Sequence, residues 1–148
     1  MRCVIVLSGD LHDEEIVRAW LARADRLICA DGGARHLRRL NVRPDLLVGD
    51  LDSLSPADRT WLDGHQVPVK QYPADKDQTD SELALRQALS LLQEPRGQHE
   101  LIILAAFGNR PDHVLANQLL AAQLAAEGWH LILTDGVTTQ YTLTIGQE

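Results

Sequence analysis

Short apolar runs recur along the chain and are separated by longer amphipathic segments. Each run has the length and composition typical of a strand buried on both faces. The predicted strands are Cys3 to Leu7, Leu27 to Ala30, Leu46 to Val48, Val67 to Val69, Leu101 to Ala105 and Leu131 to Leu133. The predicted helices are Asp13 to Ala24, Gly33 to Leu40, Pro56 to Gly64, Thr79 to Gln93 and His113 to Gly128. This alternation predicts an α/β fold, a doubly wound, mainly parallel, Rossmann-like sheet with helices on both faces.

Two of the predicted helices carry capping signals at their first residues. Ser55-Pro56 places a capping hydroxyl before a proline, and Thr79 is followed three residues later by Glu82 in a capping-box pattern. The pattern changes near the end of the chain, where Thr138 to Ile145 alternates polar and apolar residues in a β-rich way. We therefore expect firm helix starts at the first two places and additional β structure at the third.

Charge and hydropathy narrow the functional class. The 148 residues include 21 Asp and Glu against 14 Lys and Arg, a formal net charge of −7. That balance provides no basic stripe to offset phosphate charge, which argues against a general nucleic-acid binder. No stretch approaches the roughly 18 apolar residues of a membrane helix, and Met1 to Gly9 is too short for a secretory signal. We expect a soluble, cytoplasmic chain in which Cys3 and Cys29 act as small buried hydrophobes.

Acidic residues follow four consecutive predicted strands, from the second to the fifth. In open parallel sheets, ligands bind outside the carboxyl ends of the strands, so these residues are expected on one rim. The acidic residues at these four strand ends are Asp31, Asp50, Asp52, Asp75, Asp77, Asp80 and Asp112.

Two of these acids form an Asp-x-Asp pair. Asp50 and Asp52 point the same way where the chain is extended, which suits a hard cation such as Mg²⁺. A solvated turn is the alternative for an isolated pair. Asp75, Asp77 and Asp80 favour the cation, because clustered like charges repel one another. Asp80 also fits the first turn of a helix, where the helix dipole favours a carboxylate.

Residues with phosphate-binding chemistry lie on the same rim. Gly32-Gly33 at a strand-to-helix turn would let backbone N–H groups approach a phosphate, and a packing or turn role is the alternative. Arg110 could clamp phosphate oxygens or be a surface charge, Asp112 could cap the next helix, and His113 could be a surface residue. No spacing indicates a Ser-His-Asp or Cys-His nucleophile or a Walker-type loop. The histidines without metal-ligand spacing are His12, His36, His65, His99 and His130.

Four motifs follow one another along the chain. They are Ala30-Asp31-Gly32-Gly33-Ala34, Pro44-Asp45 leading to Gly49-Asp50-Leu51-Asp52-Ser53, Asp75-Lys76-Asp77-Gln78-Thr79-Asp80, and Arg110-Pro111-Asp112-His113 with Asn117. Together they resemble the catalytic domain of thiamine pyrophosphokinase, and the resemblance runs from about Leu7 to Ile145. It implies Mg²⁺-dependent transfer of a pyrophosphoryl group from ATP to thiamine, giving thiamine diphosphate and AMP. The acidic rim fits this chemistry, because phosphoryl transfer needs positioning and charge stabilisation.

The resemblance also implies roles for individual residues. The expected Mg²⁺ ligands are Asp50, Asp52 and Asp80, with Asp75 and Asp77 as further ligands or water holders. The expected nucleotide-binding residues are Asp31, Gly32, Gly33, Thr79, Arg110, Asp112, His113 and Asn117. Asp80, Asp77 and Arg110 are expected to carry catalysis, with Arg110 gripping the transferred phosphates. The acceptor of the thiamine hydroxyl proton stays open between Asp77, Asp80 and Asp112, and a loose transition state needs no strong base.

The chain departs from the family pattern in two places. Gly108 is followed by Asn109 where many members have two glycines before the arginine. The family also carries a smaller β-rich domain that completes the thiamine site across a homodimer. We expect 1–137 to be the α/β catalytic domain and 138–148 to begin the connection to that second domain, the rest of which is missing here. The expected partners of the full-length protein are ATP, thiamine and a second copy, without nucleic acid or membrane.

Three alternative functions use similar residues. A pyrophosphokinase for another small alcohol, such as a hydroxymethylpterin, would use the same acids. A haloacid-dehalogenase-like phosphatase also has an Asp-x-Asp after an apolar strand, but here the pair follows the third strand and the other rim acids stay unexplained. A non-catalytic nucleotide- or metal-binding module is the third alternative, for the case that the missing domain is needed for activity.

Overall fold

A computed structural model describes residues 1–75, 77–93 and 96–143. Its strands form one sheet in the order β4-β3-β2-β1-β5-β6-β7, in which β7 alone is antiparallel to its neighbour. The strands are β1 (Arg2–Val6), β2 (Arg26–Ala30), β3 (Leu46–Gly49), β4 (Val69–Gln71), β5 (Glu100–Leu104), β6 (His130–Thr134) and β7 (Thr139–Tyr141). The expected mainly parallel, doubly wound sheet is therefore confirmed.

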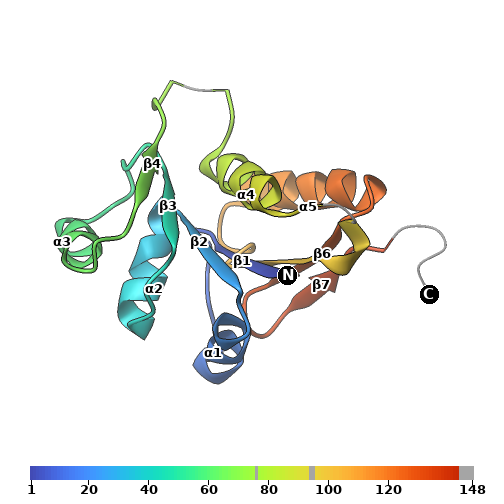
Figure 1. Ribbon diagram of the computed structural model, residues 1–148, viewed down its shortest axis with the longest axis horizontal. Helices are drawn as coiled ribbons and strands as arrows, with labels where there is room; N and C mark the ends of the chain where they lie inside the picture. Colours follow the sequence, from blue (N-terminus) through green and yellow to red (C-terminus); the bar gives the residue numbers. More distant parts are fainter. Residues whose placement is uncertain (76, 94–95, 144–148) are drawn as a thin grey trace.

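Helices cover both faces of this sheet. Figure 1 shows α1 and α2 on one face and α4 and α5 together on the other, with α3 beside α2 near the β4 edge. The helices are α1 (Glu14–Ala22), α2 (Ala34–Leu40), α3 (Pro56–Gly64), α4 (Asp80–Leu91) and α5 (Pro111–Ala126), with short 3₁₀ turns η1 (Asp31–Gly33) and η2 (Arg96–Gln98). None of the helices within the described residues has the length and apolar character needed to cross a membrane.

The central strands are buried on both faces, as their apolar runs predict. On β1, Cys3 and Ile5 pack under α4 and α5, whereas Val4 and Val6 point to the face covered by α1 and α2. All four side chains are fully buried. Burying a side chain such as Ile5 stabilises the fold by about 1.5–3 kcal/mol, so two-sided apolar strands hold the sheet between its helix layers.

The fourth predicted strand is wrong in position and in burial. The strand expected at Val67 to Val69 forms at Val69–Gln71, and its three side chains are exposed. β4 is an edge strand that pairs only with β3, so it lacks the second neighbour and the helix cover of the central strands. Val67 is buried instead in the turn that ends α3, where its backbone N–H donates to Leu62 O at 3.1 Å.

Both signalled helix starts are confirmed, but within the described residues the reciprocal capping box forms at Ser55 with Asp58 and not at Thr79 with Glu82. Ser55 Oγ accepts from the backbone N–H of Asp58, and Thr79 Oγ1 accepts from that of Glu82, each at 3.1 Å. The last helix starts two residues earlier than expected, because Pro111 occupies its first turn. Proline suits that position, since its fixed φ is helical and its missing N–H has no partner there.

The β-rich segment near the C-terminus forms β7, which pairs with β6 and is the other edge of the sheet. Within the expected segment from Thr138 to Ile145, residues 144 and 145 lie outside the described residues. β7 extends the catalytic sheet past residue 137, and the connection of this region to a second domain stays a prediction.

Candidate active site

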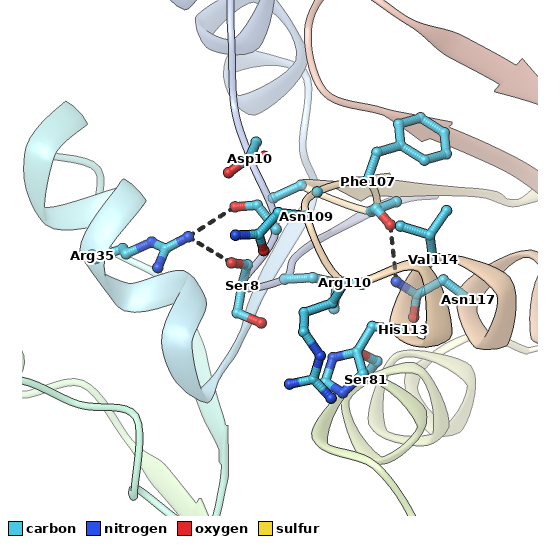
Figure 2. A pocket seen from close by; sticks show the side chains of 15 residues that line it. Ser8, Asp10, Arg35, Ser81, Phe107, Asn109, Arg110, His113, Val114 and Asn117 are labelled. Atoms are coloured by element: carbon cyan, nitrogen blue, oxygen red, sulfur yellow. Dashed lines mark hydrogen bonds between the residues drawn. The ribbon is translucent and has the colours of Figure 1, made fainter.

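A cavity of about 250 Å³ opens at the carboxyl ends of β1 and β5. From β1 the sheet grows to β4 on one side, and the chain then returns through α4 to place β5 on the other side of β1. The loops after β1 and β5 therefore diverge, and such a switch point is where open parallel sheets bind ligands. Figure 2 shows these loops meeting side chains from α2, α4 and α5 around the cavity.

The loop after β1 is fitted tightly against the loop after β5. Gly9 N–H donates to Ala105 O at 3.1 Å, and Asp10 N–H donates to Phe107 O at 2.7 Å. A β-carbon on Gly9 would lie 2.1 Å from Phe107 O and 2.3 Å from Ala105 O, so only glycine fits. Ala105 has φ 56°, a left-handed conformation that costs a non-glycine residue about 1–2 kcal/mol. The close fit of the two loops thus requires glycine at position 9 after β1 and a strained backbone conformation at Ala105 after β5.

Helix α2 holds the same loop from the other side. Arg35 Nη2 donates to Ser8 O at 2.6 Å and to Gly9 O at 3.0 Å. His36 Nε2 lies 2.7 Å from Gly9 O. Because the carbonyl oxygen of Gly9 can only accept, His36 donates this hydrogen bond through Nε2, and burial lowers the pKa of His36. The strand-end rule applied to the first apolar run would have found Ser8 to Asp10, which sequence reasoning missed, whereas Arg35 and His36 had no sequence signal.

Three carboxylates from three different elements converge beside this cavity. Asp31 follows β2, Asp50 follows β3 and Asp80 begins α4. One carboxylate oxygen of each lies within 4.8 Å of the others, and we refer to these residues as the acidic cluster. Gly49 permits their approach, because a β-carbon there would lie 2.8 Å from Asp31 Cβ and 3.3 Å from Asp80 Cγ. Carboxylate oxygens in such a group are the ligands that Mg²⁺ prefers.

Asp31 is the most deeply buried carboxylate of the acidic cluster, and two further carboxylates lie beside it. Burial, together with the neighbouring carboxylates of Asp50 and Asp80, raises the pKa of Asp31 to about 6, against a lowering contribution from the Ser53 N–H. Asp31 is 2% exposed, and its Oδ1 accepts no hydrogen bond within the part of the chain that the structure describes. A bound divalent cation would offset this repulsion, so the residues present fit a metal ion.

A second cavity, of about 120 Å³, borders the acidic cluster. It is lined by Asp31, Gly32, Ser53, Thr79 and Asp80, among others. Four residues line both cavities, namely Ser8, Ser81, His113 and Asn117. The acidic cluster and the larger cavity therefore form one continuous site.

Three of the expected metal ligands lie outside the acidic cluster. Asp52 is exposed, and its backbone N–H donates to Asp50 Oδ1 at 3.0 Å. The chain between Asp50 and Asp52 is not extended, because Leu51 has φ 71°. The expectation that the two side chains point the same way assumed an extended chain, so that condition is not met. Asp75 and Asp77 are exposed in the loop before α4. Among the described residues, the structure thus brings together Asp31, Asp50 and Asp80, and a ligand role for the other three stays a prediction.

The two glycines after β2 have different surroundings. A β-carbon on Gly33 would lie 2.3 Å from Val6 O, so this residue is required for packing against β1. Gly32 also packs closely, with its β-carbon position 2.8 Å from Ser8 Cβ, and it lines the smaller cavity. Packing therefore accounts for Gly33, whereas Gly32 is within reach of a ligand.

Arg110 lines the larger cavity and is paired with a carboxylate. Its Nε and Nη2 donate to the two oxygens of Asp112 at 3.1 and 2.7 Å. The Arg110 hydrogen bond lowers the pKa of Asp112 to about 2. Asp112 lines neither cavity, whereas His113 and Asn117 line both. Asn117 is buried and donates through Nδ2 to Ala106 O at 3.0 Å, which fixes its position below the β5 loop.

Comparisons with known proteins identify relatives along most of this chain. Residues 17–133 match the family model described as thiamin pyrophosphokinase, catalytic domain. The chain is 28% identical over 115 residues to thiamine pyrophosphokinase 1 of Oryza sativa subsp. japonica and 36% identical over 95 residues to thiamine pyrophosphokinase of Bacillus subtilis (strain 168). These matches cover 64% and 63% of the chain, and 42% of each relative. The chain thus spans less than half the length of these relatives.

Solved structures show the same fold. The thiamin pyrophosphokinase family protein of Enterococcus faecalis superposes with a TM-score of 0.73 at 31% identity, covering 94% of this chain and 63% of that protein. Thiamine pyrophosphokinase of Bacillus subtilis gives 0.74 at 26% identity, covering 90% and 60%. The yeast enzyme gives 0.77 at 16% identity over 90% and 58%, a likeness of fold alone. Together with the matched residues 17–133, the superposition places this chain in the thiamine pyrophosphokinase family, within its catalytic domain.

Proposed function

We propose that this chain is the catalytic part of an Mg²⁺-dependent enzyme that transfers a pyrophosphoryl group from ATP to thiamine, forming thiamine diphosphate and AMP. The observation that carries the proposal is the continuity between the acidic cluster and a cavity lined by Arg35, Arg110 and His113. A metal-bound polyphosphate is complementary to both, because its cation suits the carboxylates and its free oxygens suit the basic side chains. Family membership supports the same reaction.

The acidic cluster would hold the metal ion. Asp31, Asp50 and Asp80 supply carboxylate oxygens from three elements whose relative positions are set by the sheet. A Mg²⁺ ion held by these residues would supply positive charge to offset that of the phosphates. Asp52, Asp75 and Asp77 are proposed to act at the exposed side of this site, as further ligands or through held water.

The proposed reaction exchanges one P–O bond for another. The hydroxyl oxygen of thiamine bonds to the β-phosphorus of ATP, the bond from that phosphorus to the oxygen bridging the α- and β-phosphates breaks, and AMP leaves with that oxygen. Arg110 is exposed and lines the larger cavity. Its guanidinium can therefore exchange a hydrogen bond to the carboxylate of Asp112 for one to a phosphate oxygen. Asn117 and Ser81 provide polar walls where the two cavities join.

The hydroxyl proton needs an acceptor or leaves to water. Asp112 is a poor candidate, because its pairing with Arg110 holds its pKa at about 2. That argument leaves Asp77 and Asp80. We place the greater weight on Asp80, because it combines the first turn of α4 with membership of the acidic cluster.

Phosphorus NMR of the natural full-length protein with ATP, Mg²⁺ and candidate alcohols tests this function. AMP and thiamine diphosphate formed only when thiamine is present support the proposal. AMP formation with a hydroxymethylpterin in place of thiamine would reassign the acceptor. Nucleotide binding without turnover of any alcohol would support a binding module instead. The same panel applied to the 148-residue chain measures the activity of this chain by itself.

The family resemblance is the basis for proposing a cellular location and an oligomeric state. We propose a cytoplasmic homodimer in which the region beginning at Thr138 leads toward a β-rich domain that completes the thiamine site. Size-exclusion chromatography with light scattering on the full-length protein tests the oligomeric state.

A further inference from the structure

The larger cavity contains two arginines in different electrostatic situations. Arg110 is paired through two hydrogen bonds with the carboxylate of Asp112. Arg35 reaches the cavity from α2, and among the residues that the structure describes it donates only to the carbonyl oxygens of Ser8 and Gly9 (Figure 2). Within the described residues, Arg35 forms no ion pair, so its positive charge is fixed in place without a carboxylate partner.

The two carbonyls orient the Arg35 guanidinium. Both hydrogen bonds use Nη2, at 2.6 and 3.0 Å, which leaves Nη1 and Nε as donors for another group. The carbonyl of Gly9 is itself held by buried His36, and the loop around Gly9 is locked to the β5 loop. The guanidinium therefore rests on a rigid support, which reduces the entropy lost when it binds an anion.

The position of Arg35 indicates which phosphate it would meet. Arg35 lines the larger cavity and not the smaller one, which borders Asp31 and Asp80 of the acidic cluster. Under the proposed function, a metal-bound β,γ-pyrophosphoryl group would lie near the acidic cluster, and the phosphate attached to the nucleoside would then be the one nearest Arg35. We propose, on the basis of the proposed function, that Arg35 binds the α-phosphate of ATP and of the leaving AMP.

Two substitutions at Arg35 separate its charge from its support of the loop. Arg35→Gln keeps a hydrogen-bond donor and removes the charge, whereas Arg35→Lys keeps the charge. Isothermal titration calorimetry with Mg²⁺ present then gives the dissociation constants of ATP, AMP and inorganic pyrophosphate. For Arg35→Gln we expect about a tenfold weakening for ATP and for AMP, and a change of less than about twofold for pyrophosphate. For Arg35→Lys we expect less than about a threefold weakening for ATP and AMP.

Arg39→Gln is the matched control. Arg39 lies one turn further along α2, is exposed and lines neither cavity, so the same change of charge should alter ATP affinity by less than about twofold. Thermal unfolding of each variant checks that the fold is retained. ATP affinity unchanged in Arg35→Gln would overturn the assignment, as would equal losses in Arg35→Gln and Arg35→Lys, or a loss for pyrophosphate without one for AMP.

These binding ratios are independent of the acceptor alcohol. If the wild-type protein binds ATP but forms no thiamine diphosphate, the proposed reaction is contradicted. The dissociation constants would still decide the role of Arg35. A wild-type protein that binds neither ATP nor AMP would overturn both.

Discussion

Gly9 lies so close to Phe107 that a β-carbon on Gly9 would stand 2.1 Å from the carbonyl oxygen of Phe107. Gly9 follows β1 and Phe107 follows β5. These are the adjacent strands between which the order of strand addition reverses. The contact between Gly9 and Phe107 therefore sets the separation of the loops that line the larger cavity. The shape of the proposed nucleotide site depends on a residue that takes no part in the chemistry.

Gly9→Ala should separate these two loops. We expect a loss of about 1–3 kcal/mol in the free energy of unfolding, because the methyl group meets backbone that cannot move freely. ATP binding should weaken as well, since Ser8 and Asp10 shift with Gly9. Urea unfolding and calorimetric titration measure both effects. Gly97→Ala is the control, because a β-carbon there meets nothing within 4 Å, and equal behaviour of the two variants would contradict the prediction.

Asp80→Asn should lower the rate of AMP release by about 100-fold or more, since it removes a charged metal ligand from the acidic cluster. The concentration of Mg²⁺ needed for half-maximal activity should rise. An Mg²⁺-dependent assay with ATP and thiamine measures both. Asp63→Asn makes the same chemical change at an exposed position on α3 and should leave the rate unaltered. Near-normal AMP release by Asp80→Asn would contradict the proposed role of Asp80 as a metal ligand.

Asp31→Asn should have opposite effects on stability and on metal binding. Without metal, Asp31 is a buried carboxylate beside Asp50 and Asp80, so removing its charge should stabilise the protein by about 1–2 kcal/mol at pH 8. Thermal unfolding in EDTA measures this gain. Mg²⁺ should stabilise the variant less than it stabilises the wild type. A variant that is less stable than the wild type in EDTA would show that charge repulsion in the acidic cluster is small.

Asp58→Ala tests a structural carboxylate away from the site. Burial alone would raise the pKa of Asp58, but hydrogen bonds from Arg38 and Ser55 outweigh it and hold that pKa below its usual value. We expect a loss of about 2–3 kcal/mol at pH 7, from the lost cap and charged hydrogen bond.

The pH dependence of that loss has a definite sign. Because the pKa of Asp58 is lower in the folded state, its contribution is complete above about pH 4–5 and disappears as the pH falls through the folded pKa. The difference in unfolding free energy between the wild type and Asp58→Ala should therefore shrink below about pH 4. Urea unfolding across pH 3–7 measures it, with Asp63→Ala on the same helix as the exposed control. A difference that grows toward low pH would contradict the assignment.

Most secondary structure could be predicted because it depends on neighbouring residues. Two-sided apolar runs such as Leu101 to Ala105 mark central strands, and the hydroxyls of Ser55 and Thr79 mark helix starts through contacts three residues away. The prediction was wrong where position in the sheet mattered. β4 is exposed because it lies at an edge of the sheet. The residues around Val67 and Val69 carry no local pattern that indicates an edge position.

The candidate site divides along the same line. The acids on the rim could be found from sequence, because each follows a strand and carboxyl ends of parallel strands share one edge. Which acids meet depends on the backbone between them: the chain is not extended at Leu51 and Asp52 stays outside the acidic cluster, whereas Gly49 lets Asp31 approach Asp80. Sequence reasoning also left out Ser8 to Asp10 and Arg35, which become site residues only because β1 lies beside β5.

The sequence by itself thus determined most of the elements, the α/β class and the side chains available at the rim, since periodicity, capping and strand ends are properties of short segments. Only the tertiary structure decided the order of the strands, the grouping of Asp31, Asp50 and Asp80, and the support of Arg35 by Ser8 and Gly9. These relationships join residues far apart in the chain, and they arise from the packing of β1 between β2 and β5, which no local pattern encodes.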